Sequence, residues 1–143
     1  MGFSWPVRVY WEDTDGGAVV YYANYLRFLE RARTEWLRAQ GYAQRELAQR
    51  LGILFTVVSL HIDYRSPARL DDELEVTCEP RLEGSVSLRF AQHVSRRADA
   101  TRAAQLLAEA SVRVACVDAV TLKPKRLPDF VLRALPQPEV AHG

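Results

Sequence analysis

A cluster of residues that could do chemistry lies near the start of the chain, in the stretch E12-D-T-D-G-G-A-V-V-Y-Y-A-N-Y25. Two aspartates and two glycines lead into a short apolar run, and a charged, helix-like segment follows. A turn needs only one Asp or Gly, so the second carboxylate needs another reason. Four interpretations are open: a metal-binding loop, a phosphate-handling loop, a catalytic carboxylate, or a polar connection with solvated aspartates.

Spacing and context disfavour the first two interpretations. A calcium loop that began at Asp13 would need a ligand at its fifth position, glycine at the sixth and a bidentate glutamate at the twelfth. The chain has Gly17, Ala18 and Asn24 at these positions. The D-x-D-G of residues 13–16 also resembles the nucleophile motif of haloacid-dehalogenase-like phosphatases. That family needs an apolar parallel strand before the motif and alternating strands and helices after it, and this sequence has neither.

A catalytic carboxylate beside a helix N-terminus agrees with the stretch. The free N–H groups of a helix's first turn, together with the helix dipole, stabilise a developing oxyanion. An Asp about seven residues earlier, across a Gly-Gly turn, can approach the same point and act as a nucleophile or activate water. This arrangement suits acyl transfer, in which the anion forms on a carbonyl oxygen. From the residues alone, a capped turn with solvated aspartates stays open beside it.

Composition limits the classes of function. The 143 residues are enough for a single domain over 1–143, with a frayed tail over 136–143. A formal net charge of +1 gives no reason to expect nucleic acid as a partner. Cys78 and Cys116 lie far apart in alternating apolar patterns, which predicts buried thiols in a reducing compartment. Because no apolar run is long enough for a signal peptide or a membrane span, we expect a cytoplasmic protein.

A long amphipathic helix is predicted after the carboxylate stretch, over residues 25–40. Asn24 is a suitable N-cap and Gly41 a suitable stop. Spacings of three and four place one apolar series on the buried face: Leu26, Leu29, Ala32 and Trp36. The other face carries charges that can pair along the helix: Arg27, Glu30, Arg31, Arg33, Glu35 and Arg38.

Most of the remaining chain alternates with period two and is predicted to form strands. A first strand is expected over 7–12, and four more follow the helix over 54–64, 73–79, 85–94 and 106–116. Short helices are expected over 43–50 and over 128–135, and the connections include 66–72, 80–84 and 96–104. One amphipathic helix against a five-stranded, mainly antiparallel sheet is an α+β architecture. Such a sheet has a second face and two edges to cover, which predicts an oligomer.

A family resemblance covers nearly the whole chain. Residues 7–37, with E-D-T-D and Y-x-N-Y-L-R-F-x-E-R-A-R, resemble the hotdog-fold acyl-CoA thioesterases. More narrowly they resemble the 4-hydroxybenzoyl-CoA thioesterase group and its Tol-Pal-associated YbgC-type branch, to which residues 64–76 and 117–128 are also similar. The resemblance implies a long central helix wrapped by the sheet, and hydrolysis of an acyl-CoA thioester to a carboxylic acid and free CoA without a metal or bound cofactor. It also implies a homo-oligomer, a dimer or tetramer, with active sites at a subunit interface.

The same resemblance implies two catalytic positions. The family's essential aspartate corresponds to Asp15, as nucleophile or as base, and the backbone N–H that polarises the thioester carbonyl corresponds to Tyr22. The branch usually reads D-A-G-G-V-V-Y-H where this chain has D15-G-G-A-V-V-Y-Y22. Tyr22 therefore replaces a histidine that is thought to assist catalysis. We expect Asp13 to orient the turn and Ala18 to stiffen it at a negative φ.

The substrate and the competing functions follow from the same reasoning. CoA carries phosphates, and the candidate contacts are basic residues in loops or at strand ends: Arg65, Arg69, Lys123, Lys125 and Arg126. No nucleophile motif accompanies the histidines, so a catalytic triad is not expected. The alternative function is a non-catalytic module that binds an acyl thioester or an acyl-carrier protein and is associated with the cell-envelope system. A dehydratase of the same fold would carry a helix histidine, and none lies between Asp15 and Leu60.

Overall fold

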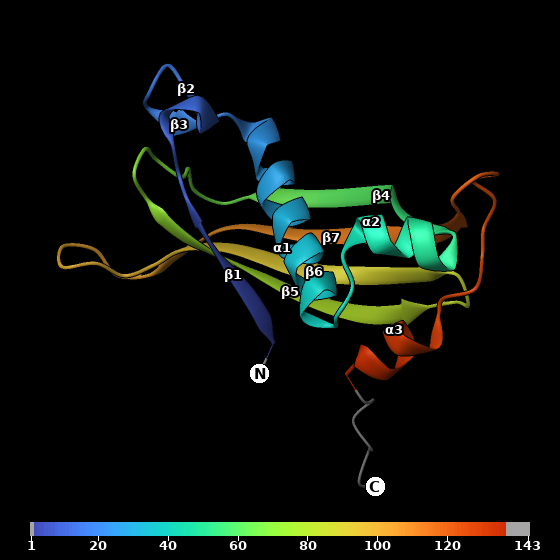
Figure 1. Cartoon of the computed structure of the whole chain (residues 1–143). Helices are drawn as coiled ribbons and strands as arrows, with labels where there is room; N and C mark the ends of the chain where they lie inside the picture. The colour runs from blue at the N-terminus through green and yellow to red at the C-terminus, as the bar shows by residue number, and fades with distance from the viewer. Residues whose placement is uncertain (1, 137–143) are drawn as a thin grey trace, which may run out of the picture.

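The structure is a computed structural model that describes residues 2–136 (Figure 1). Its elements in chain order are β1 (Phe3–Arg8), η1 (Trp11–Asp13), β2 (Thr14–Asp15), β3 (Val19–Val20), η2 (Tyr22–Asn24), α1 (Tyr25–Ala39), α2 (Gln44–Glu46), η3 (Leu47–Leu51), β4 (Ile53–Tyr64), β5 (Glu73–Glu83), β6 (Ser87–Arg96), β7 (Gln105–Asp118) and α3 (Asp129–Ala134). Here η1 and η2 are single 3₁₀ turns, and η3 is a π-helical continuation of α2.

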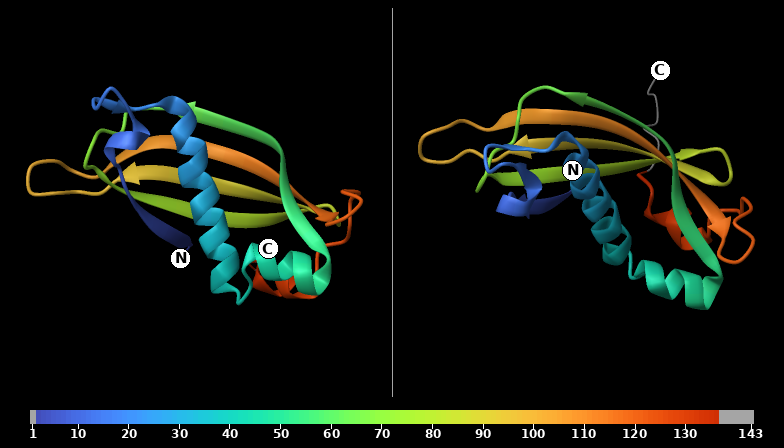
Figure 2. Two further views of the ribbon diagram at one scale, coloured as in Figure 1. Left: turned by 45° about the horizontal axis from the view of Figure 1, so that its top comes forward. Right: turned by 90° about the horizontal axis from the view of Figure 1, so that it is seen from above.

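A five-stranded sheet forms the body of the molecule, with the strand order β1-β5-β6-β7-β4. Every neighbouring pair is antiparallel. The long helix α1 lies across one face, and the sheet curves around it (Figure 2). This confirms the predicted α+β architecture with a wrapped central helix. It also leaves β1 and β4 as the two edges of the sheet.

The buried stripe of α1 follows the expected spacing, except at its first position. Leu29, Ala32 and Trp36 are buried as predicted, and they extend through Tyr25 and Phe28. Leu26 is 40% exposed, so its predicted burial is wrong. The buried stripe begins one residue earlier, at Tyr25. Because neighbouring residues lie about 100° apart around a helix, Leu26 is turned away from the sheet.

The first strand differs from its prediction over 7–12. It ends at Arg8, and Trp11 is 65% exposed rather than buried. The chain leaves the sheet because Asp13 closes a turn: its carboxylate Oδ2 accepts the Tyr10 N–H at 2.9 Å, and its own N–H donates to Tyr10 O at 3.0 Å. Asp13 is 4% exposed, so the structure gives it the turn-orienting role that the sequence predicts.

The strand predicted over 73–79 is longer than expected. It continues through Pro80 to Glu83, so the connection predicted over 80–84 is shorter. Proline is tolerated there because β1 pairs with β5 only as far as Cys78, which leaves the next residues without a neighbour on that side.

The chemistry predicted for the cysteines is also found. Cys78 and Cys116 are free and buried, and burial raises the pKa of Cys78 to about 12. Neither thiol is therefore a reactive nucleophile. Within residues 2–136, no helix has the length and apolar character needed to cross a membrane. The predicted tail lies outside the described residues from 137 onward.

Candidate active site

The carboxylate stretch folds into a small hairpin at the entrance of α1. Asp15 lies on β2 and pairs with Val19 of β3, and its side chain is exposed. Gly16 and Gly17 turn the chain between the two strands with φ of +67° and +82°. Only glycine adopts such angles at little cost, which explains the Gly-Gly pair. Ala18 has no positive φ, as expected.

The hairpin is packed against an aromatic ring and is braced from inside. A Cβ atom on Gly17 would lie 2.2 Å from Cζ3 of Trp11, whereas a Cβ on Gly16 would meet nothing within 4 Å. Thr14 Oγ1 donates to Trp11 O at 2.6 Å and accepts the Gly17 N–H at 2.9 Å. Trp11, although exposed, therefore fixes the path of the turn that carries Asp15.

One carbonyl oxygen ties this hairpin to the helix. Asp13 O accepts the Tyr21 N–H at 3.1 Å and the Asn24 Nδ2 amide at 2.8 Å. Asn24 is the N-cap residue of α1, as predicted, but its side chain makes no capping hydrogen bond to the helix. Its side chain instead bridges back eleven residues to the segment before Asp15. Asp15 and the first turn of the helix are thereby held in one unit.

Tyr22 occupies the position where a helix offers free N–H groups. It is the first residue of η2, which leads directly into α1. Within residues 2–136, the Tyr22 N–H makes no hydrogen bond. Its carbonyl oxygen accepts the hydroxyl of Tyr64, at the end of β4, at 3.0 Å. The free N–H thus belongs to a residue whose backbone is anchored from both the hairpin and the sheet.

Four tyrosines cluster around this point. The Tyr22 ring lies 4.9 Å from that of Tyr21 and 6.2 Å from that of Tyr64, and the Tyr64 ring lies 5.2 Å from that of Tyr25. The neighbouring Tyr22 hydroxyl, and more weakly the charge of Asp15, raise the pKa of Tyr21. Burial raises the pKa of Tyr25 and of Tyr64. The raised pKa values make Tyr21, Tyr25 and Tyr64 neutral at physiological pH, so their hydroxyls do not act as bases.

The connection between β4 and β5 closes over the hairpin. Val20 N–H donates to Ala68 O at 2.8 Å, and Ala68 N–H donates to the Tyr25 hydroxyl at 2.9 Å. Arg69 forms an isolated bridge with Val19. One candidate phosphate-binding residue therefore lies directly beside the strand that follows the Asp15 turn.

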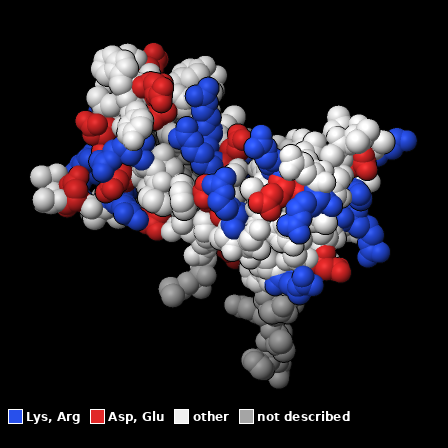
Figure 3. Space-filling model, viewed as in Figure 1, with Lys and Arg blue, Asp and Glu red and all other residues white. Residues whose placement is uncertain are grey.

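The other predicted basic residues are spread over two places. Arg65 follows Tyr64 and is paired with Glu109. Lys123, Lys125 and Arg126 lie on the loop after β7, near the start of β4, and Lys125 approaches Asp118 at 4.0 Å. Within one chain the structure therefore does not bring the two groups together. Figure 3 shows basic and acidic side chains interspersed on the viewed face rather than one positive field.

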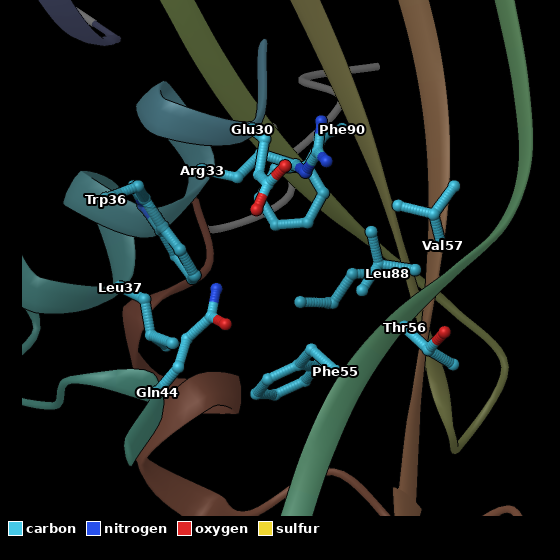
Figure 4. Close-up of a pocket in the computed structure, with 11 residues that line it drawn as sticks. Glu30, Arg33, Trp36, Leu37, Gln44, Phe55, Thr56, Val57, Leu88 and Phe90 are labelled. Atoms are coloured by element: carbon cyan, nitrogen blue, oxygen red, sulfur yellow. The ribbon is translucent and has the colours of Figure 1, made fainter. Parts of the chain in front are cut away.

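A cavity at the other end of α1 was not predicted from the sequence. It has a volume of about 270 Å³ and lies between the second half of α1, β4 and β6 (Figure 4). Arg33, predicted on the solvent face, is instead half-buried and lines it. Its partner is the fully buried Gln92. Gln92 interrupts an inward-facing apolar series on β6 that includes Phe90 and Val94. A polar residue at an inward position was the one feature of the sequence that could have indicated a buried polar partner for Arg33.

One long helix wrapped by a five-stranded antiparallel sheet is the architecture of the hotdog class of proteins, and the exposed carboxylate and the free N–H at the helix entrance form the candidate site on it. Comparison with solved structures agrees with this class. A 1,4-dihydroxy-2-naphthoyl-CoA thioesterase from Synechocystis superposes with a TM-score of 0.84 at 25% identity, over 94% of this chain and 96% of that one. A probable thioesterase from Bartonella henselae superposes with a TM-score of 0.78 at 30% identity, over 90% and 100%.

Sequence comparison establishes the family. The model of the thioesterase-like superfamily matches residues 9–135. The acyl-CoA thioester hydrolase YbgC of Escherichia coli is 44% identical over 136 residues, which are 94% of this chain and 96% of that protein. The acyl-CoA thioesterase YbgC of Haemophilus influenzae is 44% identical over 133 residues, 93% of each. The chain belongs to the thioesterase-like superfamily, and it is a thioester hydrolase.

The hydrogen bond from Tyr64 to the Tyr22 carbonyl yields a prediction about catalysis. Tyr64→Phe removes only the donor that anchors the residue with the free N–H, so we expect kcat to fall about tenfold with KM nearly unchanged. The thermal midpoint should stay close to that of the wild type because the Tyr64 side chain is 45% exposed. Steady-state kinetics and thermal unfolding measure both effects.

Tyr25→Phe is the matched control for that variant. It removes a hydroxyl from the same cluster, but one that accepts a buried N–H. We expect a loss of about 1–3 kcal/mol in the free energy of unfolding with kcat retained. Equal kcat losses in the two variants would show that the cluster acts only as packing.

The two turn glycines should respond differently to a methyl group. Gly16→Ala costs only the backbone strain of a positive φ, about 1–2 kcal/mol. Gly17→Ala adds a clash with the Trp11 ring, so the hairpin has to move. We expect kcat/KM to fall at least tenfold further in the second variant. Similar kcat/KM values for two folded variants would contradict this account of the turn.

Proposed function

We propose that the protein hydrolyses an acyl-CoA thioester to a carboxylic acid and free CoA, with Asp15 and the Tyr22 N–H as the reacting groups. The observation that carries this proposal is the link through Asp13 O, which joins the hairpin that carries the exposed Asp15 carboxylate to the helix entrance that carries the free N–H. The relatives from Escherichia coli and Haemophilus influenzae are named as acyl-CoA thioester hydrolases, which supports CoA as the carrier.

The chemistry assigned to this unit requires no group beyond the chain and water. As a base, the Asp15 carboxylate takes a proton from water while the water oxygen attacks the thioester carbonyl carbon. The electron pair moves to the carbonyl oxygen, where the Tyr22 N–H and the helix dipole stabilise the negative charge. Collapse of this intermediate breaks the C–S bond, and the thiolate receives the proton from Asp15. As a nucleophile, the Asp15 carboxylate would attack the same carbon and displace the CoA thiolate as the C–S bond breaks; water then hydrolyses the mixed anhydride to the carboxylic acid, restores the Asp15 carboxylate and supplies the proton that the thiolate takes up.

The edge strand β4 supports a dimer in which this site is completed by a second copy. Val57, Val58 and Leu60 on β4 are 46%, 50% and 38% exposed, and β4 contains no proline. The other edge, β1, contains Pro6, which cannot donate to a new strand. We therefore place the twofold axis at the middle of β4, with the strands of the two copies antiparallel.

Antiparallel pairing of β4 has a consequence for the substrate. The Tyr64 end of β4 lies beside the catalytic hairpin, and the Ile53 end lies beside the loop after β7. Pairing about the middle of the strand brings the hairpin of one copy to the Ile53 end of the other. Arg65 and Arg69 of one copy then lie near Lys123 and Arg126 of the other, which supports these four residues as contacts for the phosphates of CoA.

The alternative function is a module that binds an acyl thioester or acyl-carrier protein without cleaving it. Tyr22 favours it, because a phenol lacks the imidazole that lets a histidine both accept and donate a proton. Two considerations support hydrolysis instead. The role proposed for Tyr22 uses its backbone, and the relatives at 44% identity are named as hydrolases.

Removal of the carboxylate charge tests the proposal. Asp15→Asn should lower kcat by a factor of about 10²–10⁴ because its amide can neither accept the proton nor attack. The fold should be unaffected, since the Asp15 side chain is exposed. The measurement is steady-state hydrolysis of short, long and aromatic acyl-CoA thioesters, with circular dichroism to verify folding.

The matched control is Glu12→Gln, which neutralises an exposed carboxylate three residues away and should keep wild-type kcat. Turnover retained in Asp15→Asn would overturn the assignment of Asp15. Saturable binding of thioesters by the wild type without any turnover would establish the binding module instead.

A further inference from the structure

The cavity at the second half of α1 combines an apolar lining with a polar end. Trp36, Leu37, Phe55 and Phe90 form apolar walls, and Trp36 packs edge-on against Phe90 at 5.6 Å between ring centroids. Arg33 lines the same cavity (Figure 4). With a volume of about 270 Å³, the cavity fits a compact group and excludes a long acyl chain.

Within the described residues Arg33 forms no salt bridge, and its charged neighbour in this cavity is Glu30. Its Nη1 donates to Gln92 Oε1 at 3.0 Å, and within residues 2–136 no carboxylate oxygen lies within 4.0 Å of its guanidinium. Gln92 is fixed in turn, because its Nε2 donates to Leu29 O at 3.1 Å and to Thr77 O at 3.2 Å. Burial lowers the pKa of Arg33. A guanidinium carries five N–H donors, so an acceptor that enters this cavity would satisfy a desolvated cation.

The charge next to Arg33 narrows the kind of acceptor. Glu30 lies one helical turn earlier and also lines the cavity. Its carboxylate opposes the entry of a second negative charge into a partly desolvated space. The position therefore favours an uncharged oxygen, such as a ketone, over a carboxylate.

The cavity is too far from the catalytic unit of its own chain to serve it. Arg33 is eleven residues after Tyr22, which corresponds to roughly 16 Å along a helix axis. Thr56 and Val57, on the Ile53 half of β4, line the cavity. The antiparallel pairing of β4 proposed above brings the hairpin of a second copy to this half of the strand.

We propose that this cavity binds the acyl group of a thioester held at the hairpin of the second copy, and that Arg33 selects compact acyl groups with an uncharged oxygen acceptor at the far end. This inference rests on the proposed thioesterase function. It assigns substrate selection to a residue pair, Arg33 and Gln92, that has no part in the cleavage step.

Three isosteric substrates test the selection directly. The acyl groups 5-methylhexanoyl, 5-oxohexanoyl and glutaryl have the same length and differ only in the two atoms on the fifth carbon, which are two methyl groups, a methyl group and a keto oxygen, or the two oxygens of a carboxylate. We expect kcat/KM of the wild type to be about tenfold higher for 5-oxohexanoyl-CoA than for either of the others, the factor typical of one charge-assisted hydrogen bond.

Variants at Arg33 assign the preference to its donors. In Arg33→Met, the ratio of kcat/KM for 5-oxohexanoyl-CoA to kcat/KM for 5-methylhexanoyl-CoA should fall to about one, mainly because kcat/KM for the oxo compound falls. Arg33→Lys keeps a cationic donor and should retain a preference, so the test survives if the Met variant fails to fold. Equal kcat/KM for the two compounds in the wild type would overturn the inference while leaving the thioesterase function intact. Absence of any hydrolysis would overturn the function itself.

A hybrid dimer tests the contribution of the second copy. Coexpression of Asp15→Asn and Arg33→Met chains with different tags allows purification of dimers that contain one of each. If the cavity serves the other copy, the only active site combines Asp15 with an intact Arg33, and the hybrid keeps the wild-type preference at about half the activity. If the cavity serves its own chain, the active site contains Met at position 33 and the preference is lost, which would contradict the inference.

Discussion

The site depends on one carbonyl oxygen. Asp13 O accepts two donors from the entrance of α1, Tyr21 N–H and Asn24 Nδ2, while the Asp13 carboxylate closes the preceding turn onto Tyr10. Asp15 lies two residues after Asp13, and Tyr22 directly follows Tyr21, so both proposed catalytic positions lie next to residues that share this oxygen. The same atom therefore ties the hairpin that carries the proposed carboxylate to the helix entrance that carries the proposed oxyanion donor, which limits the backbone movement required when the charge develops.

The exposed edge of the sheet is the basis of the proposed dimer. The single helix α1 covers one face of five strands, and the edge strand β4 keeps exposed apolar residues along its middle. The proposed catalytic unit lies at one end of this strand and the cavity at the other. In the proposed twofold pairing, the Tyr64 end of β4 in one copy lies beside the Ile53 end in the other. The proposed catalytic unit of one copy then lies close to the cavity of the other. The polar pair Arg33 and Gln92 then lies in an apolar wall, where a half-buried guanidinium with unused N–H donors favours a further acceptor.

Much of the fold could be predicted from local pattern, whereas the links between elements could not. Periodicity located α1 and the four long strands because half-buried elements alternate at 3.6 or 2 residues. It failed at Trp11 and Leu26, where a side-chain hydrogen bond to Asp13 and a one-residue shift of the buried stripe decided the outcome. The bond from Tyr64 to Tyr22 spans 42 residues, and such a contact leaves no local signature. The contact between Arg33 and Gln92 also joins residues far apart in the sequence. Its one local sign was a polar glutamine at an inward-facing strand position.

The most direct measurement of the central claim is the amide proton of Tyr22 in the presence of an uncleavable substrate. The chain has six tyrosines, so selective ¹⁵N-tyrosine labelling gives a readable spectrum. The probe is an acyl-CoA analogue in which CH₂ replaces the thioester sulfur, so the carbonyl remains but cannot be hydrolysed. Our account predicts that saturation moves the Tyr22 N–H resonance downfield by more than any other tyrosine amide, in the wild type and in Asp15→Asn. A Tyr22 resonance that does not move while the analogue binds would contradict it.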